Sequence, residues 1–141
     1  MTLRTSFSLA AFTLGLAGTA TAGDWTCSYD GHWSTENNPA AGVLRWKLGW
    51  NGAGTDWTLS GKAKDDYGHS VLVGKCADWA CTITQHYSDG KLKGIDYVWT
   101  GKYTDRTVRD GRTVNDFTGT WVATDGLSKG TWDAHGECKR N

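Results

Sequence analysis

The sequence predicts an all-β protein, a small antiparallel up-and-down barrel of about eight strands that carries two disulfides. Three features predict it: runs in which apolar and polar residues alternate, Asn-Gly and Asp-Gly dipeptides, and four cysteines that can pair. Alternation with a period of two is the strand period, and no stretch shows a helical period. A two-sheet β-sandwich is the alternative architecture.

The N-terminus has the pattern of a secretory signal peptide. Arg4 precedes an apolar run at 7–17 that is too short to span a bilayer. Ala20-Thr21-Ala22 then offers the small residues that a signal peptidase accepts. We therefore expect residues 1–22 to be removed, leaving 23–141 as a single mature domain without a membrane span, exported to the periplasm or the extracellular space.

The mature composition excludes one class of partner and predicts an unusual core. Removal of Arg4 leaves 14 of the 15 basic residues against 15 acidic residues, so we expect no nucleic-acid partner. Leu, Ile, Val and Phe supply only 16 of the 119 mature residues, while nine Trp and five Tyr are present. Aromatic rings must therefore provide the apolar area that aliphatic side chains usually provide.

Cysteine use agrees with an oxidising compartment, because all four cysteines lie in the mature part. Of the three possible connectivities we favour Cys76 with Cys81, which flank a short segment, and Cys27 with Cys138, near the two mature ends. The second bridge closes a long loop and should stabilise the fold by roughly 4 kcal/mol. Paired metal-binding knuckles are missing, so we expect neither a metal nor a cofactor.

Turn dipeptides at 30–31, 51–52, 89–90, 110–111 and 125–126 predict hairpins, because a type I′ turn needs positive φ at both central residues. Two strands are read from residues that share a face: Leu44, Trp46, Leu48 and Trp50 in one, and Trp79, Cys81, Ile83, Gln85 and Tyr87 in the other. Other strands are expected at about 24–29, 55–63, 69–75, 92–104, 114–124 and 127–136, with a loop at 34–42.

A glycine stands two residues before an aromatic in 101–103, 119–121 and 130–132. Both residues then face the same side, and an aromatic from a neighbouring strand can cover the gap that the glycine leaves in a coiled sheet. In an up-and-down barrel the first and last strands are antiparallel neighbours, which would bring Cys27 close to Cys138. Barrel closure and the disulfide prediction therefore support each other.

The Gly-Thr-Trp repeats at 119–121 and 130–132 and the segment Thr-Gly-Lys-Tyr-Thr-Asp at 100–105 resemble avidin-like small barrels and, more loosely, calycin barrels. The resemblance covers the C-terminal third of the chain. It implies a ligand in an open barrel mouth near several Trp residues. No biotin-pocket motif aligns, so the resemblance assigns no binding residue.

Most of the nine Trp residues are expected to be packing residues, and a few to form a binding site. Trp46, Trp50 and Trp57 are predicted to line a concave site for a glycan or a small apolar ligand, because two same-face positions precede a turn and the third follows it. Trp79 is predicted to be a rigid, exposed anchor, since a disulfide between Cys76 and Cys81 would hold its loop.

The segment 105–116 predicts a long hairpin tip that carries Arg106, Arg109 and Arg112. With a two-residue turn at 110–111, Arg109 would face Arg112 and Asp105 would face Asp116, which is unfavourable for like charges. The arginines of such a hairpin would bind the carboxylates of a partner protein or an anionic ligand. The alternative is a shifted register, with a bulge that interleaves the charges into solvated ion pairs.

We expect no enzyme, because the sequence lacks a nucleophile elbow, a His-Glu-x-x-His motif and a phosphate-cradling glycine loop. The four histidines are scattered and are expected at the surface: His32, His69, His86 and His135. A carboxylate pair for glycoside hydrolysis stays open, formed either by Asp65 with Asp66 or by Asp105 with Asp116.

We favour an exported, non-catalytic binding protein with an aromatic-lined site for a glycan or small apolar molecule, because the abundance of Trp is the larger anomaly. The alternative is an inhibitor or immunity-type protein directed at a lysozyme-like enzyme or a protease. An open interior would favour the first, and a filled interior would favour the second.

Overall fold

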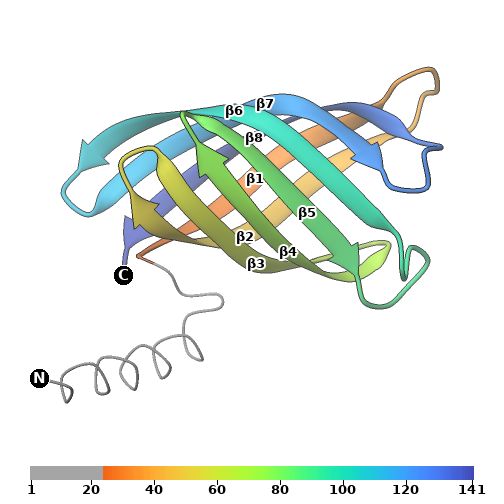
Figure 1. Ribbon diagram of the computed structural model, residues 1–141, viewed down its shortest axis with the longest axis horizontal. Coiled ribbons are helices and arrows are strands. Elements are labelled where there is room, and N and C mark those ends of the chain that lie inside the picture. Colours follow the sequence, from red (N-terminus) through yellow and green to blue (C-terminus); the bar gives the residue numbers. More distant parts are fainter. Residues whose placement is uncertain (1–23) are drawn as a thin grey trace, which may run out of the picture.

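The computed structural model describes residues 24–141 and confirms the predicted barrel (Figure 1). Each strand pairs antiparallel with the next, and β8 pairs with β1 to close the sheet. The strands are β1 (Trp25–Thr35), β2 (Ala41–Ala53), β3 (Asp56–Asp65), β4 (Gly68–Ala77), β5 (Ala80–Tyr87), β6 (Asp96–Arg109), β7 (Arg112–Ala123) and β8 (Lys129–Arg140). The predicted signal peptide, 1–22, lies outside the described residues, and among those described no helix has the length and apolarity of a membrane span.

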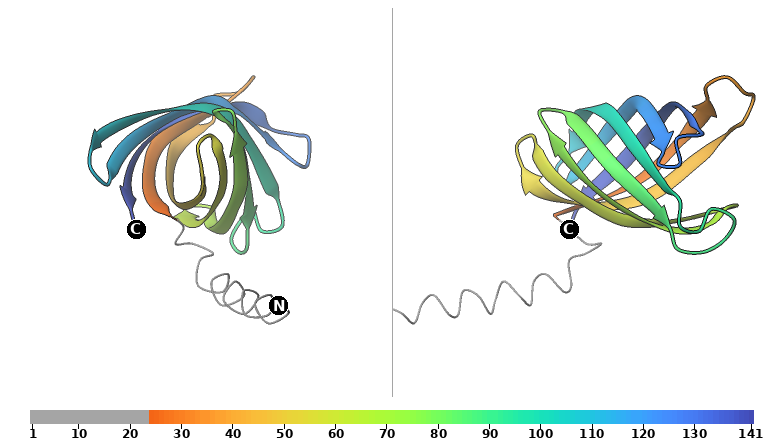
Figure 2. Two further views of the ribbon diagram at one scale, coloured as in Figure 1. Left: turned by 60° about the vertical axis from the view of Figure 1, so that its left-hand side comes forward. Right: turned by 45° about the vertical axis from the view of Figure 1, so that its right-hand side comes forward.

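Both predicted disulfides are present, and each joins residues that lie directly opposite in the sheet. Cys27 pairs with Cys138 across β1 and β8, and Cys76 pairs with Cys81 across β4 and β5. Figure 2 shows the closed wall of strands, with the C-terminus beside the start of β1. The antiparallel pairing of the first and last strands brings the two ends of the barrel domain together, as barrel closure predicts.

Both disulfides lie at one end of the barrel, which we call the stapled end. It contains the β2–β3, β4–β5 and β6–β7 turns, the start of β1 and the end of β8. The opposite end contains the β1–β2, β3–β4, β5–β6 and β7–β8 connections. Two covalent links therefore hold this end together: one joins β1 to β8, and the other joins β4 to β5 beside their turn.

Side chains fill the barrel interior. Leu44, Trp46, Leu48 and Trp50 of β2 are all buried, as their predicted shared face requires. They pack with the other buried residues of one continuous core, which include Tyr29, Leu59, Leu72, Ile83, Trp99, Tyr103, Phe117, Trp121 and Trp132. Two surface hollows, of about 460 and 640 Å³, lie instead on the outer wall of β1, β2, β7 and β8.

Glycines opposite aromatic rings let the sheet coil around this core. Trp132 reaches from β8 across β7 to β6, where a Cβ at Gly101 would lie 2.9 Å from its ring. Its indole N–H donates to the carbonyls of Thr100 and Thr120. Because the ring occupies the space above a glycine and also satisfies its own polar atom, it can be fully buried. The predicted device of glycine covered by a neighbouring aromatic is thus observed.

The turn predictions are only partly right. The dipeptides at 110–111 and 125–126 lie in turns, and 89–90 lies in the β5–β6 loop. Those at 30–31 and 51–52 lie inside β1 and β2, so these two turn predictions are wrong. A Cβ at Gly31 would lie 1.9 Å from the Asp133 carbonyl oxygen, so the glycine allows the β8 backbone to approach β1 closely at this position. The turn at 66–67 was not predicted. Cys81, Ile83, Gln85 and Tyr87 share the buried face of β5, but Trp79 lies in the β4–β5 turn before that strand, so its predicted place on this face is wrong.

We expect the two disulfides to stabilise the barrel unequally, because the loops they close differ in length: Cys27 and Cys138 are separated by 111 residues, and Cys76 and Cys81 by 5. Replacing the first pair by Ser should lower the free energy of unfolding by roughly 4 kcal/mol, and replacing the second by about 2 kcal/mol. Denaturant unfolding without reductant measures both. The reverse order would contradict the role assigned to the Cys27–Cys138 bridge.

Candidate binding site at the stapled end

Three of the four predicted Trp residues gather at the stapled end. The Trp50 ring lies 5.7 Å from Trp57 and 5.2 Å from Tyr103, and the Trp79 ring lies 5.0 Å from Tyr103. Trp50 is buried, Trp57 is half-buried and Trp79 is 44% exposed. Trp46 instead lies deeper in the core, between two other indole rings. The set therefore splits, and ligand binding by these residues stays a prediction.

Trp79 is held in an unusual backbone conformation. Asp78 and Trp79 form the two-residue turn between β4 and β5, and their φ angles are 52° and 70°. A bulky residue rarely adopts positive φ, and such strain concentrates at functional sites. The Cys76–Cys81 disulfide closes the strands just behind the turn, and the Trp79 carbonyl accepts a hydrogen bond from the Tyr103 N–H at 2.9 Å. An exposed indole is thus fixed in place.

The β6–β7 hairpin has the predicted turn but a different register beyond it. Arg109 lies opposite Arg112, as predicted. The register then shifts between Thr107 and Arg109, so Asp105 lies opposite Asn115 and the predicted pairing of Asp105 with Asp116 is wrong. The bulge at 108 adds one residue to β6, as the alternative register allowed, but the ion pairs expected with that alternative are not formed by Arg106, Arg109 or Arg112 among the described residues.

Three cations lie side by side across β6, β7 and β8 at this end. Arg109 is opposite Arg112, and Arg112 is opposite Lys139. Among the described residues, none of the three side chains takes part in an ion pair. Like charges directly opposite destabilise a sheet unless something neutralises them. Lys139 was not predicted, because only the β7–β8 register places it beside Arg112.

The C-terminus fixes the position of this cation row. The Arg140 backbone N–H donates to the Gly111 carbonyl at the hairpin turn, and the Arg140 guanidinium lies 5.0 Å above the Trp25 ring. Arg106 lies on β6 opposite Val114, farther from the tip. The hairpin tip is therefore tied to the end of β8, which reduces the entropy lost when a partner binds.

Beneath this surface lie four buried polar atoms without a well-aligned hydrogen bond among the described residues: Tyr29 Oη, Trp50 Nε1, Tyr103 Oη and Asn115 Oδ1. The side chains of Asn115 and Trp50 nevertheless interact with the Tyr29 hydroxyl, and both interactions oppose the rise of its pKa that burial causes. None of these residues is more than 4% exposed. Leaving a buried donor or acceptor unpaired costs about 1–3 kcal/mol, and native structures contain few such groups. At this end of the barrel the contacts of Asn115 and Trp50 with the Tyr29 hydroxyl partly satisfy the group.

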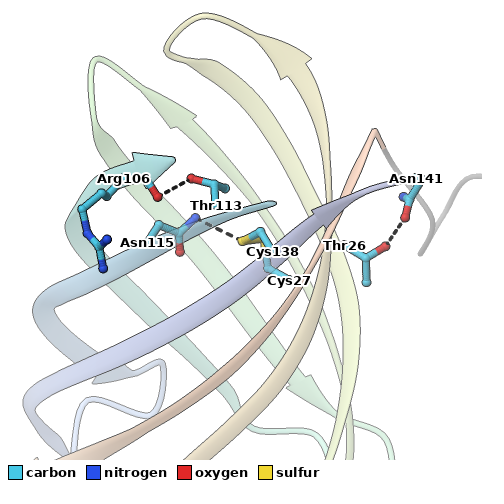
Figure 3. Close-up of a disulfide and its surroundings, with 7 residues drawn as sticks. All are labelled: Thr26, Cys27, Arg106, Thr113, Asn115, Cys138 and Asn141. Atoms are coloured by element: carbon cyan, nitrogen blue, oxygen red, sulfur yellow. Dashed lines mark hydrogen bonds between the residues drawn. A yellow bond between two sulfur atoms is a disulfide. The ribbon is translucent and has the colours of Figure 1, made fainter. Parts of the chain in front are cut away.

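These four groups converge on Phe117. The Phe117 ring centre lies 5.5 Å from that of Tyr29, 5.7 Å from Tyr103 and 6.2 Å from Trp50. Asn115 precedes Phe117 on the same face of β7, and its Nδ2 lies 3.6 Å from Cys138 Sγ (Figure 3). The inward faces of β1, β2, β6 and β7 therefore supply one cluster, which we call the buried polar cluster.

Gly136 allows two members of this cluster to meet. It lies on β8 between Tyr29 of β1 and Asn115 of β7. A Cβ at this position would lie 2.2 Å from the Tyr29 ring and 2.9 Å from Asn115 Oδ1. The glycine thus lets the tyrosine ring cross β8 toward Asn115. No local sequence signal could reveal this contact, because it joins three strands.

Burial controls the protonation of the cluster. It raises the pKa of Tyr103 to about 12 and raises the pKa of Tyr29 further, so both hydroxyls keep their protons at neutral pH. Burial also raises the pKa of the Asp105 carboxyl, and the Asn115 side chain opposite partly offsets this effect. The cluster therefore offers neutral donors and acceptors, with one carboxyl at its edge.

The histidines lie away from this site. Each has its Nδ1 against a carboxylate on an exposed part of the surface: His32 with Asp133, His69 with Asp89, His86 with Asp96, and His135 with Asp116. Hydrogen bonds from the backbone and ring of His69 lower the pKa of Asp89. Within residues 24–141 no group of three or more His, Cys, Asp or Glu has a metal-binding arrangement.

In each candidate carboxylate pair one member contacts a different side chain. Asp65 accepts a hydrogen bond from the Tyr87 hydroxyl at 2.6 Å at the end opposite the disulfides, and burial raises the pKa of that hydroxyl. Asp116 contacts His135 on the outer wall, one residue out of register with Asp105.

Comparisons with family models, curated proteins and solved structures find no match to this chain. They do not test the resemblance to avidin-like barrels.

We expect Asp105→Asn to stabilise the protein near neutral pH. Because the pKa of Asp105 is raised above 3.8 in the folded state, stability is lost as pH rises from 3.8 through the folded value. The gain should therefore vanish below pH 3.8, where the carboxyl is protonated in both states. Thermal unfolding at both pH values measures this, with Asp110→Asn at the hairpin turn as the matched control. Asp105 is an exposed residue whose carboxyl is only partly desolvated, and a lower Tm for Asp105→Asn at neutral pH would contradict that desolvation.

Proposed function

We propose that this chain is a non-catalytic binding protein that recognises another protein through its stapled end. The filled interior supports this proposal most directly, because indole rings occupy the space that a ligand would use in an open barrel. A small disulfide-bonded barrel with a buried aromatic core is compatible with a binding protein. Its rigid exposed features, rather than its lumen, are then the means of recognition.

The stapled end offers the two kinds of residue that dominate protein interfaces, an aromatic anchor and arginines. Trp79 is 44% exposed on a turn that a disulfide closes, and Arg109 and Arg112 lie in the unpaired cation row with Lys139. Carboxylates on a partner would neutralise that row and form bidentate contacts with the arginines. The partner surface is therefore acidic, with an apolar depression for one indole ring.

Two further observations support an inhibitor or immunity-type role outside the cytoplasm. Both disulfides are formed and no free cysteine remains among the described residues, which suits an oxidising environment. The histidines and carboxylates most suited to acid–base chemistry lie on the outer wall or in pairs, apart from the exposed indole. A pre-organised surface that binds without reacting is what a proteinaceous inhibitor requires.

Affinity capture from a periplasmic or secreted fraction tests this proposal. The wild-type chain should retain an acidic protein, and the double variant Arg109→Glu with Arg112→Glu should lose it. The matched control, Lys91→Glu with Lys93→Glu, makes the same charge change in the exposed β5–β6 loop at the opposite end and should retain the partner. Retention should also weaken as salt rises, because the contacts are between exposed charges.

Circular dichroism confirms that each variant is folded before capture. Trp79→Ala should weaken retention at least tenfold without abolishing the salt dependence. If the Arg109→Glu, Arg112→Glu variant retains the same protein as well as the control variant does, recognition does not use the cation row and the proposed interface is wrong.

A further inference from the structure

We infer that the unpaired edge of β2, residues 41–46, is a docking site for an extended acidic segment of a partner protein, which would add a strand to the sheet. This edge lies at the end of the barrel opposite the disulfides. The inference therefore goes beyond the interface proposed above and does not depend on it. The unpaired backbone of the edge and the cations on both sides of it carry the inference.

The ladder between β2 and β3 covers only the second part of β2. It runs from Ala53, opposite Asp56, to Lys47, opposite Lys62, and β3 then continues to Asp65 without pairing to β2. Figure 2 shows the two strands side by side near their turn and diverging toward the other end of the barrel. Within residues 24–141 no strand pairs with 41–46 on the side away from β1. The closed sheet therefore keeps an exposed edge at this place.

The backbone of this edge presents hydrogen-bonding groups to solvent. The Thr35 N–H donates to the Ala40 carbonyl at 2.9 Å, so the backbone of Ala40 faces β1. Successive residues of an antiparallel strand point their N–H and C=O groups to opposite sides, so those of Ala41, Val43 and Arg45 point away from β1. An exposed row of such groups is a template for pairing with another strand.

This edge lacks the devices that commonly protect exposed edges. Proteins blunt them with a proline or a bulge, and neither interrupts residues 41–46, where the register with β1 is continuous. Val43, in the middle of the edge, is 60% exposed. The edge of β6 beyond Lys102, by contrast, carries the bulge at 108. The β2 edge is therefore the one prepared for strand addition.

Cations on both sides of this edge define the partner segment. Lys62 and Lys64 lie on the outer face of β3, and Arg45 lies on the outer face of β2, where it contacts Asp30 at 3.5 Å. Lys62 is directly opposite Lys47, and neither lysine forms an ion pair among the described residues. A strand added between β2 and β3 would place its outward side chains among these cations, so acidic residues are complementary there.

The inner faces of β2 and β3 define the other side chains of the segment. Leu44 is buried on β2, and Ala63 of β3 is partly buried against the core. Because side chains of a strand alternate between its two faces, the segment would present apolar residues inward and acidic residues outward. In strand addition the main-chain hydrogen bonds supply affinity, and side chains on alternate positions supply specificity.

A second copy of this chain fits the edge less well than an acidic segment does. Residues 41–47 contain two cations, Arg45 and Lys47, and no carboxylate. Pairing with the same edge of another copy would therefore add cations beside Lys62 and Lys64 instead of neutralising them. The charge of the site favours a different chain of opposite charge.

Capped short peptides that alternate Glu with Ala, Val or Leu test the inference. Each is titrated into the full mature chain, isotopically labelled, while amide shifts and hydrogen exchange are recorded. In the free protein the amides of Val43 and Arg45 should exchange at least tenfold faster than those of Gly42 and Leu44, which face β1. At least one peptide should bind and slow exchange at Val43 and Arg45 at least tenfold.

Matched variants separate the backbone contribution from the charge contribution. Val43→Pro removes an N–H that the ladder with β1 does not use, so it should keep the fold and weaken peptide binding at least tenfold. Val43→Thr keeps the N–H and should bind as the wild type does. Lys62→Glu with Lys64→Glu should also weaken binding at least tenfold, whereas Lys91→Glu with Lys93→Glu, in the β5–β6 loop at the same end, should not.

Three results would overturn the inference. The first is failure of every acidic peptide to slow exchange at Val43 and Arg45. The second is equal binding of peptides in which Lys replaces Glu, because the cations would then not select the partner. The third is a dimer of the free chain in analytical ultracentrifugation that Val43→Pro dissociates, because a second copy would then occupy the edge. The Arg109→Glu, Arg112→Glu variant should still bind peptide, so failure of the interface at the stapled end is separately visible.

Discussion

Closure of the sheet between β1 and β8 is the constraint on which the rest of the structure depends. The register that pairs Cys27 with Cys138 also places Tyr29 beside Gly136. The register of β7 with β8 places Gly136 beside Asn115, so closure brings Tyr29 to Asn115 across one glycine. Closure therefore completes the buried polar cluster, whereas the cation row lies on the consecutive strands β6, β7 and β8. An open sheet with the same strands would separate Tyr29 from Gly136 and Asn115.

The scarcity of aliphatic residues determines how the closed sheet is filled. Indole rings are too large to interdigitate as Leu and Val do, so they cross neighbouring strands over glycines and donate their N–H groups to backbone carbonyls. Trp132 does this over Gly101, and Trp121 reaches the Ser34 carbonyl past Gly130. Trp99 instead donates to the Gln85 side-chain oxygen, and the Trp50 indole interacts with the Tyr29 hydroxyl. Trp50 lies at the stapled end, close to the strained turn of Trp79.

Much of the fold follows from local patterns, and much of the candidate site does not. Alternation identified the inward face of β2, and the positions of Cys27 and Cys138 near the chain ends agreed with barrel closure, so fold class and disulfides were predictable. Asp30-Gly31 was misread as a turn because glycine signals both turns and close strand approach, and only the register distinguishes them. The buried polar cluster draws on four strands, so its members share no sequence signal. Trp79 was predicted as an anchor from its flanking cysteines, but its positive φ was not.

Amide hydrogen exchange on the oxidised chain and on the variant with Cys27 and Cys138 both replaced by Ser tests the dependence on closure most directly. If closure organises the stapled end, the variant loses protection first along the β1–β8 seam and at Asn115 and Tyr103, while the β3–β4 and β4–β5 ladders keep theirs. Equal protection of the seam in both proteins, or a loss that begins in β3 and β4, would contradict it.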